Sequence, residues 1–352
     1  MAVATSSLSA EQRPTTRWLF SPAVDLWTFL GSAVLALALL AAGAPFGLLE
    51  NDTPDWMWIG AILMIDVAHV YSTGFRVYFD LPELKRRPWL YGLTPLLALL
   101  VGMAIYSEGE GVFWRLLAYL AVFHFVRQQY GWVALYRSRA GETGRCGFWI
   151  DAVAIYMATL YPLIHWHSNL PRNFWWFLEG DFQQLPAVFE TIAAPIYWAS
   201  LFAYLVRLGY RGMVRQQWSP GKDIVVITTA ICWYVGIVTF NSDYAFTVTN
   251  VIIHGIPYMV LVYWYRCMGN QQQPKRHFPK IATFLGIVWM LAYLEEFLWD
   301  AGVWHERSWF FGPAWSLQNY ELVLVPLLAV PQITHYVLDG FIWKRKARQG
   351  MA

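Results

Sequence analysis

Ten stretches of predominantly apolar residues follow one another along this chain of 352 residues, and polar residues, Gly or Pro separate each from the next. Each stretch has about 20 residues, which is the length that an α-helix needs to cross the hydrocarbon core of a bilayer. The predicted spans are residues 23–47, 56–79, 89–107, 112–136, 146–167, 186–207, 223–241, 244–266, 281–302 and 320–343. We therefore predict an all-α fold, a polytopic transmembrane helical bundle with no room for a soluble domain.

The composition is typical of a protein that lies mostly in lipid. Hydrophobic residues make up 57% of the chain and charged residues only 14%, whereas about a quarter of a soluble protein is charged. The 21 Trp residues are typical of membrane–water interfaces. A net charge of +2 provides no large basic field for nucleic acid. We therefore expect the lipid bilayer, and no nucleic acid, as a partner of this chain.

The positive charges predict how the bundle is oriented, because short cytoplasmic loops carry an excess of Lys and Arg. If the N-terminus is cytoplasmic, 21 of the 25 Lys and Arg residues fall in inner segments. Only Arg172 and Arg307 fall in outer segments, and Arg115 and Arg127 lie within the fourth span. One missed or invented span would put basic loops on both sides. We therefore predict ten spans with both termini in the cytoplasm.

The same pattern defines the domain organisation. We expect one transmembrane helical domain over residues 21–344, with a disordered cytoplasmic segment before it at residues 1–20 and a basic cytoplasmic tail after it at residues 345–352. The first of these flanking segments is rich in Ser, Thr and Ala, a composition that cannot bury enough apolar surface to fold. We expect a multi-pass protein of the inner (plasma) membrane.

Four of the eight histidines lie within predicted spans, namely His69, His124, His254 and His335. Their four spans all run from outside to inside, and each histidine lies about ten to fifteen residues from the outer end, a spread in depth of about 8 Å. A single intramembrane histidine is more often a packing or hydrogen-bonding residue than a ligand. Four imidazoles at nearly one depth on parallel spans favour a shared metal site, and we predict these four histidines as its ligands.

Each of these histidines has polar neighbours three or four residues away, on the same helix face. A metal-bound histidine usually gives its second ring nitrogen to a carboxylate or carbonyl, which fixes its tautomer. We expect Arg127, Asp66 and Asp339 to act in catalysis, with one of the two carboxylates as the counter-charge of Arg127. The side chains expected to surround the ligands are Asn250, Gln128, Gln332 and Tyr336.

This arrangement resembles the Brp/Blh class of membrane carotene dioxygenases, which are polytopic helical bacterial proteins. The likeness covers overall size, the number of spans and the placement of histidines. The pair His124-Phe125 and the segment from His335 to Asp339 are similar to the His- and Asp-bearing helices of that class. The resemblance implies that the dispersed histidines hold a non-haem iron.

The leading hypothesis is therefore a membrane-embedded metalloenzyme, a non-haem iron oxygenase or oxidoreductase that acts on an apolar lipid or isoprenoid. Neutral imidazoles suit iron, copper or zinc, and a site within the bilayer is most accessible to an apolar small molecule. One alternative is a haem-binding protein for electron transfer or haem handling, although the chain has no C-x-x-C-H attachment motif. Another is a non-enzymatic transporter or assembly subunit. Neither the redox partner nor the oligomeric state follows from the sequence.

Overall fold

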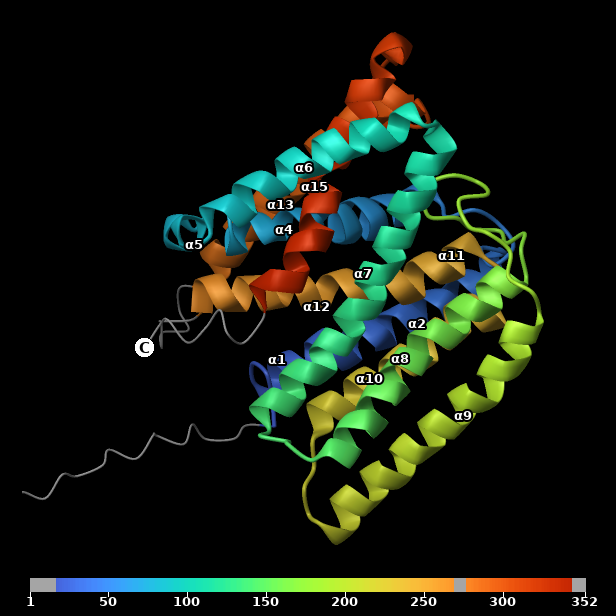
Figure 1. Ribbon diagram of the computed structural model, residues 1–352, viewed down its shortest axis with the longest axis vertical. Coiled ribbons are helices and arrows are strands. Elements are labelled where there is room, and N and C mark those ends of the chain that lie inside the picture. The colour runs from blue at the N-terminus through green and yellow to red at the C-terminus, as the bar shows by residue number, and fades with distance from the viewer. Residues whose placement is uncertain (1–16, 269–276, 344–352) are drawn as a thin grey trace, which may run out of the picture.

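The computed structural model describes residues 17–268 and 277–343, and every regular element in these ranges is a helix (Figure 1). Nine of the described segments are long and apolar enough to cross a membrane, and each coincides with one predicted span. They are Pro22–Phe46, Asp55–Arg76, Pro88–Ser107, Arg145–Ser168, Val188–Val214, Pro220–Thr239, Asp243–Arg266, Lys280–Trp304 and Gln318–Ile342. The predicted all-α polytopic bundle is confirmed.

The remaining predicted span is α7 (Glu110–Arg139), a helix of 30 residues. At 1.5 Å per residue it is about 45 Å long, ample to cross a bilayer. Arg115 and Arg127 within it, and Arg137 and Arg139 in its last turn, make it less apolar than the others. The other α-helices are α1 (Pro22–Asp25), α2 (Ser32–Gly43), α3 (Asp55–Met57), α4 (Ala68–Arg76), α5 (Leu81–Arg86), α6 (Pro88–Ser107), α8 (Arg145–Ser168), α9 (Val188–Gly209), α10 (Pro220–Trp233), α11 (Asp243–Phe246), α12 (Ile252–Tyr263), α13 (His277–Trp299), α14 (Ser308–Phe311) and α15 (Glu321–Ile342).

Several spans contain π-helical segments in addition to their α-helical parts. These are η1 (Leu26–Gly31), η3 (Trp58–Val67), η4 (Tyr210–Val214), η5 (Tyr234–Thr239), η6 (Thr247–Val251), η7 (Trp264–Met268) and η9 (Asp300–Trp304). Short 3-10 turns occur at η2 (Ala44–Phe46) and η10 (Gln318–Tyr320). π-helical turns are rare and often occur next to functional sites. Here η3 leads directly into α4, and η6 leads directly into α12.

Loops that the alternating topology places on one side meet in the structure. Lys222 at the start of α10 contacts Glu142 between α7 and α8, with 2.6 Å between Nζ and Oε2. Arg266 at the end of the eighth span contacts Asp80 in the loop after the second, at 3.1 Å. We call this side, which carries the predicted inner loops, the basic end of the bundle.

The predicted outer loops meet in the same way at the opposite end. The backbone N–H of Thr53, which precedes the second span, donates to the carboxylate of Asp243, which begins the eighth, at 2.7 Å. The side chain of Arg307, after the ninth span, lies 3.6 Å from the carboxylate of Asp55. Contacts within each set of loops support the predicted alternation of all ten spans.

The boundary predicted for the N-terminal segment needs a correction. Residues 1–16 and 344–352 lie outside the described residues, but Leu19 and Phe20 belong to the folded part. Their backbone N–H groups donate to the Asp25 carboxylate at 2.7 and 2.9 Å, and Leu19 is buried. The Asp25 carboxylate thus anchors the chain just before α1, and the folded domain begins before residue 21.

Four helices surround the centre of the bundle and position its polar side chains. α12 packs against α4, and α15 packs against α4, α6 and α7. In Figure 1, α4 and α12 run nearly side by side while α7 crosses the bundle obliquely. Each of α4, α7, α12 and α15 carries one of the four histidines predicted as ligands.

Candidate metal centre

Four histidine side chains from four different helices meet in the centre of the bundle. They are His69 on α4, His124 on α7, His254 on α12 and His335 on α15, and none is more than 3% exposed. One ring nitrogen from each of His69, His124 and His254 lies within 4.8 Å of the other two. His335 completes the group, because its Nε2 is 3.1 Å from Nε2 of His124.

The four rings form a closed arrangement with their Nε2 atoms facing inward. The Nε2 atoms of His254 and His69 are 3.1 Å apart, the same separation as between His335 and His124. Centroids of neighbouring rings are 4.6 to 5.1 Å apart, and the ring planes are steeply inclined to one another. His69 and His124 face each other across the centre at 6.3 Å.

Three of the Nδ1 atoms lie near polar groups, and that of His335 makes a hydrogen bond. Nδ1 of His335 is 2.7 Å from the hydroxyl of Thr73. Nδ1 of His69 lies 3.5 Å from the Asp66 carboxylate, and Nδ1 of His124 lies 3.8 Å from the Asp339 carboxylate. Acceptors at these positions favour the tautomer with its proton on Nδ1, which leaves the Nε2 lone pair free to bind a metal.

His254 is held differently, by packing instead of a polar partner. Its ring stacks on Phe125 with centroids 3.6 Å apart and planes inclined by only 8°. Its Nδ1 is buried without a hydrogen-bond partner. Gln128 donates to the backbone carbonyl of His254 at 2.8 Å and so fixes the local backbone of α12 to α7.

The inward nitrogens have the chemistry that a metal ion requires. A neutral imidazole donates from one nitrogen and accepts on the other. When both rings of a pair carry their proton on Nδ1, the two Nε2 atoms that are 3.1 Å apart face each other with lone pairs only. Neither nitrogen can then donate a hydrogen bond to the other, so the two lone pairs repel. The ring nitrogens of His69, His124 and His254, which lie within 4.8 Å of one another, form a donor set of the kind that holds a metal ion, and His335 lies beside it.

The structure brings Asp66, Asp339 and Tyr336 to the histidines, with one change from the sequence expectation. Asp66 lies beside His69 on its own span, as the spacing predicts. Asp339 is four residues after His335, yet its carboxylate lies nearest to His124 on another helix. Tyr336 stacks on His124 with 4.9 Å between ring centroids.

Of the predicted polar residues, Gln128 interacts with the His124 ring through its side chain, as the spacing suggested, whereas Asn250 and Gln332 bind other groups. The Asn250 amide donates to the Phe246 carbonyl at 3.3 Å and to the Thr249 hydroxyl at 3.0 Å. Gln128 bonds the backbone of His254. The Gln332 amide points to the carboxylate of Glu295, 3.5 Å away. Gln128 thus joins His124 on its own helix to the backbone of α12, while Asn250 and Gln332 hold the surrounding helices together.

The expected pairing of Arg127 with Asp66 or Asp339 is wrong. Its side chain is exposed on the outside of α7, donates to the Tyr156 hydroxyl on α8 and lies over the Tyr130 ring. It makes no ion pair among the described residues. Although Arg127 is only three residues after His124, it lies on the side of α7 that faces α8 and away from the centre.

Two contacts of the centre were not predicted from the sequence. Thr73 follows His69 by four residues and so shares its helix face, a spacing that was available as a signal. It binds His335 and also lies 3.0 Å from the Tyr258 hydroxyl. Phe125 is adjacent to His124 in sequence, but its partner is His254, and no local spacing indicates a contact between separate helices.

No family model matches the chain, and no curated protein or solved structure is similar to it. The resemblance to the Brp/Blh class therefore rests on helix content and on the placement of the histidines. A functional conclusion depends on the geometry of the four imidazoles.

Proposed function

We propose that this protein is a metalloenzyme of the inner (plasma) membrane, a non-haem iron oxygenase or oxidoreductase that acts on an apolar lipid or isoprenoid. The observation that carries the proposal is the convergence of the Nε2 atoms of four buried histidines, with two inward pairs at 3.1 Å. The burial of this centre among membrane-spanning helices makes the bilayer its natural source of substrate.

The four donors suit iron because they are neutral imidazole nitrogens, which bind iron, copper or zinc. An iron ion that keeps open coordination positions supplies oxygen chemistry to the site. The chain contributes the orientation of the ligands: Thr73 binds Nδ1 of His335, and the carboxylates of Asp66 and Asp339 lie 3.5 and 3.8 Å from Nδ1 of His69 and His124. Phe125 fixes the plane of the fourth ring, so the donor set is assembled before a metal arrives.

Partly exposed side chains beside the buried histidines support access for a substrate. The Asp66 side chain is 31% exposed although its neighbour His69 is buried. Tyr71, Gln332 and Tyr336 are also partly exposed. These residues come from the spans of α4 and α15 and border one side of the centre, where an apolar chain would approach.

Haem suits this geometry less well. Two histidines that bind one haem iron from opposite faces place their nitrogens about 4 Å apart at bond lengths near 2 Å. The Nε2 pairs of neighbouring rings here are 3.1 Å apart, closer than this spacing. A proton relay through a transporter needs groups spaced along a path, whereas the ring nitrogens of His69, His124 and His254 gather within 4.8 Å of one another.

The proposal is tested by the metal content and spectrum of the purified full-length protein. We expect about one iron per chain by mass spectrometry of metals and no Soret band in the visible spectrum. Each of the variants His69→Ala, His124→Ala, His254→Ala and His335→Ala should lose most of this iron. Oxygen uptake with a carotenoid or another isoprenoid in the detergent micelle should disappear with the metal.

A matched control is His165→Gln, because His165 binds Glu190 at the outer end of α8 and lies apart from the centre. This variant should retain its iron and its oxygen uptake. A wild-type protein without stoichiometric metal, or four histidine variants with undiminished metal, would refute the metalloenzyme. A Soret band would replace it with a haem protein.

A further inference from the structure

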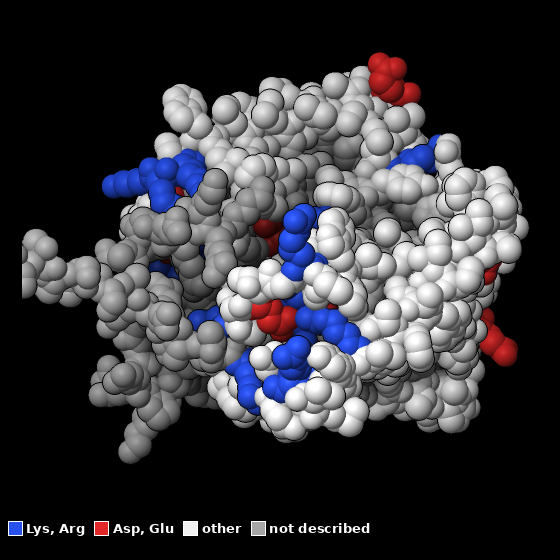
Figure 2. All heavy atoms as spheres, turned by 60° about the horizontal axis from the view of Figure 1, so that its bottom comes forward, with Lys and Arg blue, Asp and Glu red and all other residues white. Residues whose placement is uncertain are grey.

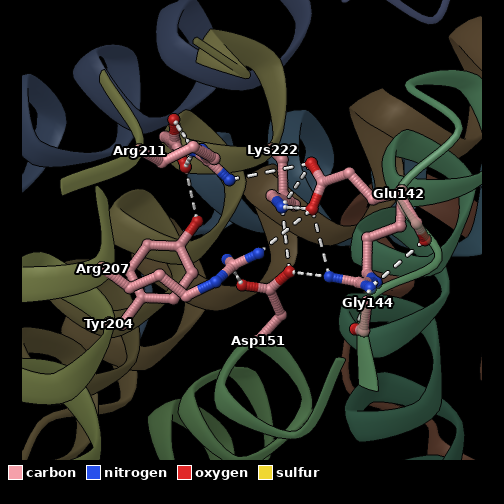
Figure 3. A network of polar contacts seen from close by, with 9 residues as sticks. Glu142, Gly144, Asp151, Tyr204, Arg207, Arg211 and Lys222 are labelled. Carbon is pink, nitrogen blue, oxygen red and sulfur yellow. Dashed lines mark hydrogen bonds and ion pairs between the residues drawn. The ribbon is translucent and has the colours of Figure 1, made fainter. Parts of the chain in front are cut away.

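A second buried polar cluster lies at the basic end of the bundle (Figure 3). It joins the loop between α7 and α8 to the ends of three other helices. Its carboxylates are Glu142, Asp151 and Asp223, and its cations are Arg137, Arg207, Arg211 and Lys222. We call these seven residues the ionic cluster.

The ionic cluster is tightly connected around Asp151, which is fully buried. Lys222 donates to Asp151 at 2.8 Å and to Glu142 at 2.6 Å. Arg207 donates to the other oxygen of Asp151 at 2.5 Å, and Arg137 also donates to this carboxylate. The cluster thus fixes α7, α8, α9 and α10 to one another at the membrane boundary.

The charges of the ionic cluster do not balance. Four cations face three carboxylates, which leaves one positive charge in a largely buried setting. Arg17 lies at the same cavity and adds another. Figure 2 shows blue and red side chains gathered near the middle of this face, with white, uncharged residues around them. An uncompensated buried charge is costly, so an anion at this place would stabilise the fold.

A cavity of about 1040 Å³ opens beside the ionic cluster. One wall carries Arg17, Arg137, Arg207 and Arg211. The lining also includes Phe202 and Val206 of α9 and Tyr210 of η4, whose side chains are exposed. The lining of the cavity therefore combines cationic and exposed apolar side chains.

Two buried groups at the cavity lack the partners that they require. The Ser219 hydroxyl is 3% exposed and makes no hydrogen bond. Arg211, 7% exposed, uses Nη2 for both oxygens of Asp223 at 2.7 Å, while its Nε makes no hydrogen bond. The cavity also borders the N-termini of α8, next to Gly144, and of α10, next to Ser219. Helix N-termini favour anions.

We propose that this cavity binds the phosphate headgroup of an anionic phospholipid, with an acyl chain along Phe202 and Val206. Arginine guanidinium groups form strong, often bidentate hydrogen bonds with phosphate. Basic pockets between helices on the cytoplasmic side are suited to lipid headgroups. A soluble phosphate would satisfy the cationic wall but would leave the apolar side chains without a partner, which is why the geometry favours a lipid.

The test uses the full-length protein, stripped of lipid in detergent and titrated with phosphatidylglycerol or phosphatidylcholine. Native mass spectrometry counts bound lipid, and thermal unfolding measures the stabilisation. We expect phosphatidylglycerol to bind preferentially and raise the melting temperature. Arg17→Gln and Ser219→Val should weaken this binding, by about fivefold for the loss of one cation. Both residues lie outside the ionic cluster, so these variants should fold.

Lys85→Gln is the matched control, since Lys85 is an exposed cation in a different loop of the basic end. It should bind phosphatidylglycerol like the wild type. Equal binding of the two lipids, or equal weakening in Lys85→Gln, would overturn the proposal. Equal stabilisation by inorganic phosphate or glycerol phosphate would overturn the assignment to a lipid. Iron content should be unchanged in all three variants, which separates this test from that of the histidine centre.

Discussion

The histidine centre and the ionic cluster are both buried polar groups in a membrane-spanning bundle, but they are built in opposite ways. The ionic cluster alternates cations and carboxylates, so most of its members satisfy one another. The histidine centre gathers four side chains of one type with their Nε2 atoms turned inward. A buried polar group must find a partner. The ionic cluster finds its partners largely within the chain, and the inward nitrogens of the histidine centre do not.

This difference separates a structural role from a binding role on the same helix. α7 contributes His124 to one cluster and Arg137 to the other, and the thirteen helical steps from one to the other span about 20 Å. Removal of a member of the ionic cluster should therefore affect folding most. Removal of a group from the histidine centre should affect metal binding most.

The largest effect should come from Asp151→Asn in the ionic cluster. The substitution keeps the shape of the side chain but leaves Arg137, Arg207 and Lys222 without their shared carboxylate. Loss of one member of a buried ion pair costs about 3–5 kcal/mol. We expect a decrease of this size in the free energy of unfolding, measured by denaturant titration in detergent, with no change in metal content per folded chain.

A double variant sharpens this prediction, because Lys222→Met removes one of the cations that Asp151→Asn leaves unpaired. The two substitutions together should cost less than the sum of their separate effects. Asp52→Asn, in an exposed outer loop, should be close to neutral. A loss below about 1 kcal/mol for Asp151→Asn would mean that the ionic cluster does not stabilise the fold.

A smaller effect is expected from the carboxylates behind the histidines. Asp66→Asn and Asp339→Asn weaken the acceptors of the Nδ1 protons of His69 and His124. Loss of such a partner typically lowers metal affinity by 10- to 100-fold. We expect a decrease in this range in competition with a chelator, while the stability of the metal-free protein changes little.

Arg127→Gln provides the control, since the structure places Arg127 on the outside of α7. Its metal affinity should equal that of the wild type. If Arg127→Gln lowered the affinity as much as Asp66→Asn, the orientation of the outward nitrogens by carboxylates would not explain metal binding at this centre.

Much of this architecture could be predicted because it depends on one-dimensional patterns. Apolar stretches of membrane-spanning length define where helices run, and each predicted span coincides with a described helix within a few residues. The depth of a residue follows from its distance along a span. His69, His124, His254 and His335 could therefore be grouped before any side-chain contact was known.

The remaining contacts depend on the rotation of each helix about its own axis, which spacing along one helix does not determine. Asp339 follows His335 by one turn but faces His124. Arg127 follows His124 by three residues but faces α8. π-helical turns before α4 and α12 shift the phase of the following residues, and nothing in the sequence indicates them. The ionic cluster was missed because its basic residues were counted only as inner-loop charges that orient the bundle.

The smallest predicted effect is the loss of stability at acidic pH that comes from Glu142. This residue is a partly exposed member of the ionic cluster, whereas Asp151 is buried. Burial alone would raise the pKa of Glu142, but Lys222, Arg211 and Arg137 outweigh it and hold the pKa below its usual value of 4.5. Glu142 is thus more acidic in the folded than in the unfolded chain. The stability that it contributes is present above about pH 4.5 and is lost as the pH falls through the lower, folded value.

We therefore expect Glu142→Gln to be less stable than the wild type at pH 7 by about 1 kcal/mol, the upper part of the range for a partly exposed ion pair. The difference should shrink as the pH falls below about 4.5, because the wild type loses the charge that the variant never had. Urea titrations in detergent at pH 7, 5 and 4 measure it. Glu108→Gln, in an exposed loop at the other end, should follow the wild type throughout. A Glu142→Gln deficit that stays constant over this range would assign its effect to lost packing, and the difference between the two clusters would then not lie in charge.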